Sequence, residues 1–242
     1  MAFLQNGRNL NSVCNQLPLN IQLRDDATFS SFYPGDNIEV IKAIHYFVSQ
    51  KEGAFLYLWG QEGVGRSHLL QAACHASSEL GYAALYLPLL EQKYFSSSIL
   101  QGIDQISLIC LDDIQAIAGL PDWEEAIFHL FNRIQLQGSR LLVAADVSPT
   151  HLPIALPDLK SRLASGVTYQ LHRLSDEQKI NALQLRAAQR GLQLAKTVGQ
   201  FLLSRCSRDM SELFLTLEEL DKASLAEQRR LTIPFVKQVL LL

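Results

Sequence analysis

The sequence has 242 residues, of which 48% are hydrophobic and 19% are charged, a balance typical of globular proteins and unlike that of extensively disordered chains. Its formal net charge of −3 excludes a global basic field that would attract nucleic acid, so a DNA-binding role would need a local basic patch. A chain of this length accommodates one sizeable α/β domain and a smaller second domain.

The cysteines and the apolar runs indicate the cellular compartment. The cysteines form no C-x-x-C pair and are expected to be reduced thiols, neither a disulfide framework nor a zinc site. They are Cys14, Cys74, Cys110 and Cys206. The first residues lack the continuous apolar segment of a secretory signal, and no apolar run approaches the roughly 18 residues of a membrane span. The sequence therefore predicts a soluble, cytoplasmic protein with no membrane partner.

Residues 1–24 are rich in asparagine, glutamine and leucine with little periodicity, and we expect them to form a flexible tail. One short pattern lies within this tail, Gln16-Leu17-Pro18-Leu19. Pro18 favours an extended chain, which would present the leucines to a groove on a partner. The residues alone leave a second interpretation open, in which the tail packs these leucines on its own domain.

The central feature of the chain is the segment 54–70, AFLYLWGQEGVGRSHLL, in which an apolar strand pattern leads into a glycine-rich loop and an amphipathic helix. It nearly matches the phosphate-binding P-loop, G-x-x-x-x-G-K-[ST], in the strand–loop–helix setting that this loop requires. Glycines let successive backbone N–H groups point at phosphate oxygens, and the helix N-terminus adds its positive dipole end. A basic side chain neutralises the outer phosphates, and a hydroxyl can ligate Mg²⁺. The residues expected around the phosphates are Gly60, Glu62, Gly63, Val64, Gly65, Arg66, Ser67 and His68.

Strand and helix patterns alternate through the first two thirds of the chain. Helices are expected at 36–49 (opened by a capping box of Asp36 and Glu39), 67–81, 91–101, 121–138 and 156–163. Strands are expected at 54–59, 82–87, 106–111, 140–145 and 167–171. This alternation indicates a parallel sheet that is covered by helices on both faces.

From Ser175 onward the patterns are helical only. Ser175 and Gln178 form another capping box, and Gly191 is expected to end the helix that they open. Further helices are expected at about 195–206, 209–225 and 234–242. With a boundary near Arg173, the sequence divides into a tail (1–24), an α/β domain (25–172) and a helical domain (173–242).

Two adjacent carboxylates, Asp112 and Asp113, follow the third expected strand. Asp112 at that strand end can hold Mg²⁺ beside Ser67, directly or through water, and Asp113 can orient a water molecule. An acidic pair alone is weak evidence, because strand ends are solvated and often acidic. Downstream of a P-loop, in a succession of strands and helices, the pair favours a nucleotide-binding site.

A set of motifs resembles the AAA+ proteins of the DnaA replication-initiator group: the P-loop, LDDIQ at 111–115, Asp146 after the fourth strand, and KSR at 160–162. The segment at 28–37, TFSSFYPGDN, is similar to that group's nucleoside-binding entry segment. The chain ends where DnaA would continue into a helix-turn-helix domain, and its tail is shorter than DnaA's N-terminal domain, so we expect no sequence-specific DNA binding. The narrower resemblance is to the DnaA regulatory inactivator family, whose DnaA-homologous members inactivate DnaA after replication starts.

The resemblance implies an AAA+ P-loop domain with a parallel five-stranded sheet covered by helices, followed by a small all-helical lid domain. It implies that Phe32, Pro34 and Asp36 lie near the nucleoside and that Asp146 is the sensor 1 residue. Arg162 matches the arginine finger, which completes a neighbouring subunit's nucleotide site; without the resemblance, a surface arginine that pairs with a local carboxylate would be the preferred interpretation. Gln16-Leu17-Pro18-Leu19 matches the motif with which this family binds the sliding clamp.

Two positions depart from the pattern of the DnaA group. Arg66 replaces the P-loop lysine, and its guanidinium is a broad planar fork where the lysine ammonium is a compact point charge. Ser211 stands where the lid is expected to carry the sensor 2 arginine, although Arg208, nearly one helical turn earlier, could reach the same place. We therefore expect a bound nucleoside diphosphate, ADP or another, with Mg²⁺, and impaired closure on ATP.

The first functional hypothesis is a regulator that binds the clamp and triggers ATP hydrolysis on DnaA through Arg162, preventing re-initiation, with homo-oligomers also possible. The second is an autonomous ATPase, such as a helicase loader or DNA remodeller, which would need intact hydrolysis and a DNA-contacting surface. The third is a nucleotide-bound adaptor without catalytic consequence.

Overall fold

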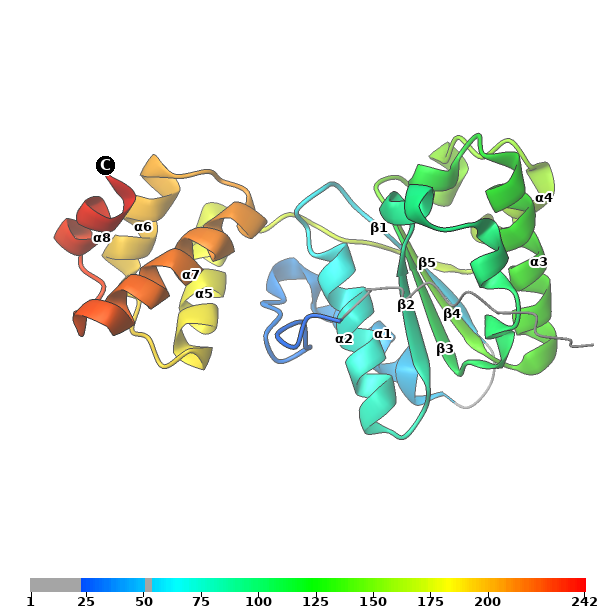
Figure 1. Ribbon diagram of the computed structural model, residues 1–242, viewed down its shortest axis with the longest axis horizontal. Coiled ribbons are helices and arrows are strands. Elements are labelled where there is room, and N and C mark those ends of the chain that lie inside the picture. Colours follow the sequence, from blue (N-terminus) through cyan, green and yellow to red (C-terminus); the bar gives the residue numbers. More distant parts are fainter. Residues whose placement is uncertain (1–22, 51–53) are drawn as a thin grey trace, which may run out of the picture.

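The computed structural model describes residues 23–50 and 54–242 and contains a five-stranded, all-parallel sheet in the order β2-β3-β4-β1-β5 (Figure 1). The strands are β1 (Phe55–Trp59), β2 (Ala84–Pro88), β3 (Leu108–Asp112), β4 (Arg140–Ala145) and β5 (Val167–Gln170). The central strands β3 and β4 are buried along their whole length, as expected of strands covered on both faces. The edge strand β2 ends at Pro88. Proline has no N–H to give to a ladder and is therefore confined to places such as edge strands.

Helices cover both faces of the sheet, as the alternating pattern predicted (Figure 1). α1 (Ile38–Ser49) and α2 (Arg66–Glu79) pack on one face, in an apolar cluster that includes Ile44 and Leu70. α3 (Pro121–Gln137) and α4 (Pro157–Ala164) cover the other face, in a cluster that includes Phe131.

Two local predictions were wrong. The expected helix at 91–101 is instead a series of short 3₁₀ turns, η2 (Leu89–Tyr94), η3 (Ser97–Leu100) and η4 (Ile103–Gln105). The Ser96 hydroxyl accepts a hydrogen bond from Ser98 N, and such local bonds by serine compete with a continuous helix. The capping box at Asp36 does not form: Asn37 precedes α1 without a side-chain cap, and Asp36 Oδ1 accepts a hydrogen bond from Gln178 Nε2 at 3.0 Å.

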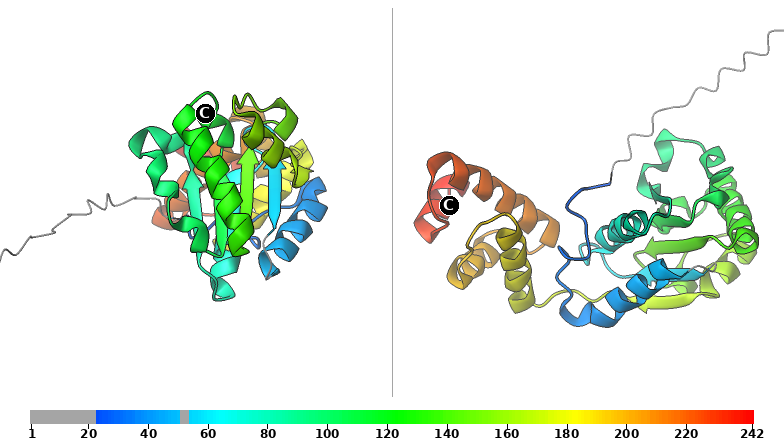
Figure 2. Two further views of the ribbon diagram at one scale, coloured as in Figure 1. Left: turned by 90° about the vertical axis from the view of Figure 1, so that its right-hand side faces the viewer. Right: turned by 90° about the horizontal axis from the view of Figure 1, so that it is seen from below.

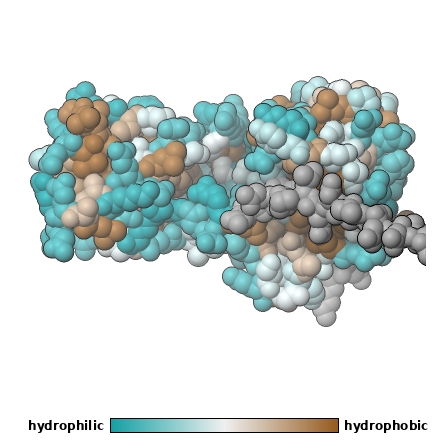
Figure 3. All heavy atoms as spheres, viewed as in Figure 1, coloured by the Kyte–Doolittle hydropathy of each residue, from teal (hydrophilic) through white to brown (hydrophobic). Residues whose placement is uncertain are grey.

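The last four helices form a bundle with its own apolar core. We call this bundle the lid. They are α5 (Asp176–Gln189), α6 (Lys196–Arg205), α7 (Met210–Glu227) and α8 (Ile233–Leu240). The capping box of Ser175 and Gln178 is confirmed, with both of its hydrogen bonds present. Figure 2 shows the lid as a separate bundle beside the sheet domain. In Figure 3 hydrophilic residues predominate on the visible face, with apolar residues gathered toward the far end of the lid.

The entry segment, residues 28–37, and the residues just before it contact the lid. Asn181 Nδ2 donates to the Tyr33 hydroxyl at 3.1 Å, and Gln189 Nε2 donates to the Ser30 carbonyl at 2.9 Å. Arg186 of α5 forms an ion pair with Asp26. In the described part of the chain, no helix combines the length and the apolar character needed to cross a membrane.

Candidate nucleotide-binding site

A cleft of about 880 Å³ opens at the carboxyl ends of the parallel strands, between the sheet domain and the lid. Its volume lies within the range of small-molecule sites, and strand carboxyl ends are where open α/β sheets bind ligands. Many of the predicted site residues line it: Phe32, Glu62, Gly63, Val64, Gly65, Arg66, Ser67, His68, Asp113, Asp146 and Ser211. Other predicted residues lie outside this lining: Pro34, Asp36, Gly60, Asp112 and Arg162. The tail motif at 16–19 lies outside the described residues.

The P-loop connects β1 to α2 and depends on two glycines in left-handed backbone conformations. Gly63 has φ +79° and Gly65 has φ +97°, a region that side chains disfavour. Gly65 is also in close contact with the entry segment, because a Cβ added to it would lie 2.5 Å from Phe32 Cε2. Since α2 begins at Arg66, the loop places backbone N–H groups and a helix N-terminus at the cleft.

Gly65→Ala is expected to weaken ADP binding by about 10- to 100-fold, because it combines backbone strain with displacement of Phe32. Gly81→Ala is the matched control, since Gly81 has φ +81° and nothing lies within 4 Å of its added Cβ. Isothermal titration calorimetry should show wild-type affinity for Gly81→Ala. Wild-type affinity for Gly65→Ala would contradict the placement of the phosphates in this loop.

Arg66, the residue at the lysine position of the motif, is engaged by acceptors of its own chain. Its side chain is 10% exposed, and its Nη2 lies 2.8 Å from Asp113 Oδ1. Its Nη1 donates to the Gly60 carbonyl at 2.6 Å. The guanidinium fork can meet both acceptors at once, which an ammonium point charge cannot do with the same geometry. Arg66 therefore ties the start of the P-loop to the end of β3.

Asp112 lies below the cleft and is buried at the end of β3. Burial, and then the negative charge of Asp113, raise the pKa of the Asp112 carboxyl above its ordinary value, while hydrogen bonds from Ser67 and Tyr86 oppose that rise. A bound cation beside Asp112 would favour its charged form. The serine hydroxyl and this carboxylate thus form a pair that fits Mg²⁺, which proteins commonly hold with one or two side chains together with phosphate oxygens and water.

Tyr86 of β2 was not singled out from the sequence. Its hydroxyl donates to Asp112 Oδ2 at 2.7 Å, and Asp113 N donates to Asp112 Oδ1 at 3.0 Å, so both oxygens of the carboxylate are oriented. Burial, followed by the charge of Asp112, raises the pKa of Tyr86, which keeps its hydroxyl protonated as a donor. The sequence shows only that Tyr86 lies within the expected strand at 82–87. The pairing of β2 with β3 is what brings this tyrosine to Asp112.

Asp113 and Asp146 occupy the floor of the cleft with Gln115. Asp113 Oδ1 accepts from Gln115 Nε2 at 2.8 Å as well as from Arg66, and Asp146 N donates to Gln115 Oε1 at 3.3 Å. The amide of Gln115 therefore connects the ends of β3 and β4. This arrangement places the expected sensor 1 residue beside the acidic pair.

His68, in the first turn of α2, fastens the entry segment. Its Nε2 lies 2.8 Å from the Thr28 carbonyl oxygen and 3.3 Å from the Ser31 hydroxyl. Burial lowers the pKa of His68, which favours the neutral imidazole. Its ring centroid lies 5.4 Å from that of Phe32, so it also supports the aromatic wall of the cleft.

The lid contributes a different set of cations from the one that the sequence suggested. Arg208, which was expected to be able to replace the arginine missing at Ser211, is 69% exposed and lies 3.7 Å from Asp176, outside the lining of the cleft. Arg186 of α5 and Arg190, the residue that follows α5, line the cleft instead. Arg186 also stacks on Phe214 of α7, with 5.6 Å from its Cζ to the ring centroid.

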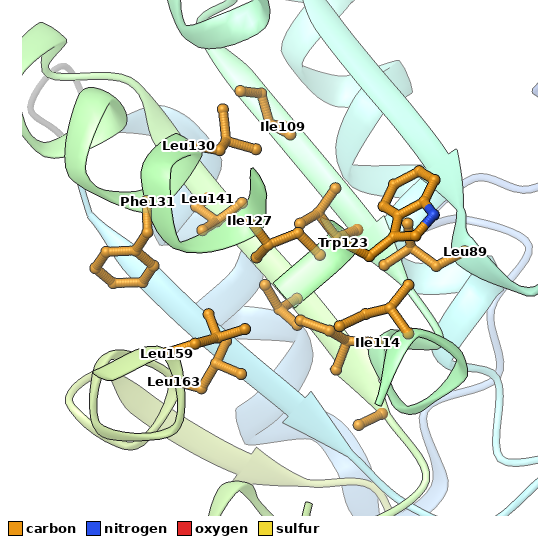
Figure 4. Packing of buried hydrophobic residues seen from close by; sticks show 14 of the residues in the cluster. Leu89, Ile109, Ile114, Trp123, Ile127, Leu130, Phe131, Leu141, Leu159 and Leu163 are labelled. Carbon is orange, nitrogen blue, oxygen red and sulfur yellow. The ribbon is translucent and has the colours of Figure 1, made fainter. Parts of the chain in front are cut away.

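Arg162 lies on α4, on the face of the sheet that α3 covers. Its Cζ lies 5.9 Å from the Phe131 ring centroid, and its Nη1 donates to Gln135 Oε1 at 3.3 Å. Figure 4 shows the two α4 leucines, Leu159 and Leu163, beside Phe131, which fixes this helix on the core. Neither Phe131 nor Gln135 lines the nucleotide cleft, so Arg162 is held away from the site of its own chain.

Comparison with known proteins places these features in a family. The model described as the bacterial DnaA ATPase domain matches residues 23–170, and the model described as Hda, lid domain, matches residues 176–240. Domain III of the replication initiation protein DnaA from Thermotoga maritima is similar, with a TM-score of 0.74 and 19% identity over 91% of this chain and 98% of that chain. AMPPCP-bound DnaA from Aquifex aeolicus gives a TM-score of 0.64 and 24% identity over 85% and 67% of the two chains. The protein therefore belongs to the bacterial DnaA ATPase family, in which its lid marks it as an Hda-like, DnaA-homologous AAA+ regulator.

Proposed function

We propose that this protein binds a nucleoside diphosphate and stimulates hydrolysis of ATP on DnaA through Arg162, thereby preventing re-initiation of replication. The position of Arg162 carries the proposal, because its contacts lie outside the cleft of its own chain. An arginine finger supplied to a neighbouring nucleotide site stabilises the charge of the transition state, an effect on the order of 10³- to 10⁵-fold in rate. In this proposal the nucleotide site that Arg162 completes is that of DnaA.

The resident ligand in this proposal is ADP with Mg²⁺, held by a sheet domain at 25–172 under a lid at 173–242. The fit of Ser67 and Asp112 to Mg²⁺ supports the metal. The AMPPCP found in a solved DnaA supports an adenine nucleotide. When bound, the metal would supply charge neutralisation at the phosphate oxygens. Two features support weak hydrolysis by the protein itself. Arg66 is already paired with Asp113, and Ser211 stands where the lid is expected to carry an arginine. In this account Asp113 acts by holding Arg66.

The decisive assay is the conversion of DnaA-bound ATP to ADP, with and without this protein, in the presence of the sliding clamp loaded on DNA. We expect the protein to accelerate the conversion while hydrolysing little ATP when assayed alone. Rapid turnover by the isolated protein would favour the autonomous ATPase. No acceleration, with DnaA binding retained, would favour the adaptor. Identifying the nucleotide that co-purifies with the protein tests the ligand separately.

We propose that the tail binds the sliding clamp through Gln16, Leu17, Pro18 and Leu19. Replacing Gln16 and Leu17 together by alanine is expected to abolish clamp pull-down, since an extended peptide of this kind binds through its side chains in a groove. Nucleotide affinity should be unchanged. Gln5→Ala, in the same tail, is the control and should bind the clamp normally. Retained clamp binding by the double variant would exclude this motif.

A further inference from the structure

The first turn of α7 in the lid lies directly against the P-loop. A Cβ added to Gly63 would lie 2.5 Å from Asp209 Oδ2, so only the absence of a side chain at Gly63 leaves room for this carboxylate. Gly63, Met210 and Ser211 line the same cleft. The contact therefore brings an acidic side chain of the lid to the loop that is expected to hold the phosphates.

The Asp209 carboxylate is fixed in this position by its role as the N-cap of α7. Its Oδ1 accepts hydrogen bonds from Ser211 N at 2.8 Å and from Glu212 N at 3.2 Å. Its own backbone N–H donates to the Ser207 hydroxyl at 3.1 Å. One carboxylate oxygen is thus committed to the helix, while the other faces the P-loop at Gly63.

The nearby basic side chains have other partners. Arg173 Nη2 donates to the Glu62 carbonyl at 3.5 Å, and Lys179 Nζ donates to the Arg208 carbonyl at 2.7 Å. Arg208, adjacent in sequence, lies 3.7 Å from Asp176, and Arg66 is paired with Asp113. Among residues 23–50 and 54–242, no basic side chain forms an ion pair with Asp209. Carboxylates of aspartate are anionic at neutral pH. The P-loop therefore faces a fixed negative charge. This charge lies two residues from Ser211, the position at which the lid lacks its expected arginine.

We propose that Asp209 makes this site select nucleoside diphosphates over triphosphates. The inference rests on the proposed nucleotide-bound function and adds the residue that determines its ligand. A P-loop backbone cradles the second and third phosphates. The third phosphate adds negative charge at the end of the chain, so a carboxylate held against the loop repels a triphosphate more strongly than a diphosphate. Because the same carboxylate also caps α7, Asp209 can discriminate between the two nucleotides without weakening the fold of the lid.

The test is isothermal titration calorimetry of ADP and of AMPPCP, each with Mg²⁺, on protein freed of bound nucleotide. We expect the wild type to prefer ADP by at least about tenfold. Asp209→Asn keeps the cap acceptor but removes the charge, and it should reduce that preference at least fivefold, mainly by tightening AMPPCP binding. Glu212→Gln, an exposed change in the same turn of α7, is the charge-matched control and should keep the wild-type preference.

Each outcome separates the inference from the function on which it rests. If Asp209→Asn keeps the wild-type preference, or if the wild type binds both nucleotides equally, Asp209 is not the selecting residue, and the proposed action on DnaA stands. If the wild type binds neither nucleotide, the proposed nucleotide-bound function is wrong, and the inference is wrong with it. Asp209→Ser, which supplies another capping side chain without charge, repeats the test should the asparagine variant have a lowered melting temperature.

Discussion

Arg162→Ala is expected to reduce the stimulation of ATP hydrolysis on DnaA by at least about 100-fold, because the alanine removes the charge that an arginine finger places on the transferring phosphoryl group. The cleft should be unaffected, since the contacts of Arg162 are with Phe131 and Gln135, outside its lining. ADP affinity and melting temperature should therefore remain those of the wild type. The measurement is single-turnover hydrolysis of ATP pre-bound to DnaA.

Two further variants make this result specific. Arg162→Lys keeps the charge but loses the planar fork, and it should also be strongly impaired. Arg230→Ala removes an exposed arginine from the lid and should stimulate DnaA normally. If Arg162→Ala stimulates hydrolysis as well as the wild type, the finger role is wrong, and the protein would be an adaptor.

Asp113→Ala is expected to lower the free energy of unfolding by about 3 kcal/mol, because it leaves the Arg66 guanidinium buried without its charge partner. The two side chains are only 10% and 11% exposed, so solvent screens this pair little. Asp113 also has φ +53°, which alanine adopts less readily than aspartate. Urea denaturation of the nucleotide-free protein measures the change.

A double variant distinguishes loss of the pair from general damage. Arg66→Met combined with Asp113→Ala should be less destabilised than Asp113→Ala alone, because no unpaired charge then remains in the interior. Glu39→Ala breaks the exposed pair with Lys42, whose side chains are 81% and 68% exposed, and should have no measurable effect. Unchanged stability of Asp113→Ala would show that the pair does not hold the P-loop to β3.

Much of the fold could be predicted because its signals are local. The apolar runs at 54–59, 106–111 and 140–145 correspond to β1, β3 and β4, and the capping box at Ser175 opens α5 as expected. A strand period, a helix period and a cap each act within a few residues. Where a local signal competed with a distant partner, the prediction was wrong: Asp36 binds Gln178 of the lid and does not cap α1.

The candidate site was predicted in its residue types but not in its contacts. The sequence by itself determined that the chain has a P-loop with an acidic pair downstream, that Arg66 stands at the lysine position, and that a helical lid follows. Only the tertiary structure decided that Arg66 is bound by Asp113, that Tyr86 orients Asp112, and that Asp209 faces Gly63. The physical reason is that residue type and periodicity are properties of a short segment, whereas the partner of a side chain depends on which strands pair and where the lid docks.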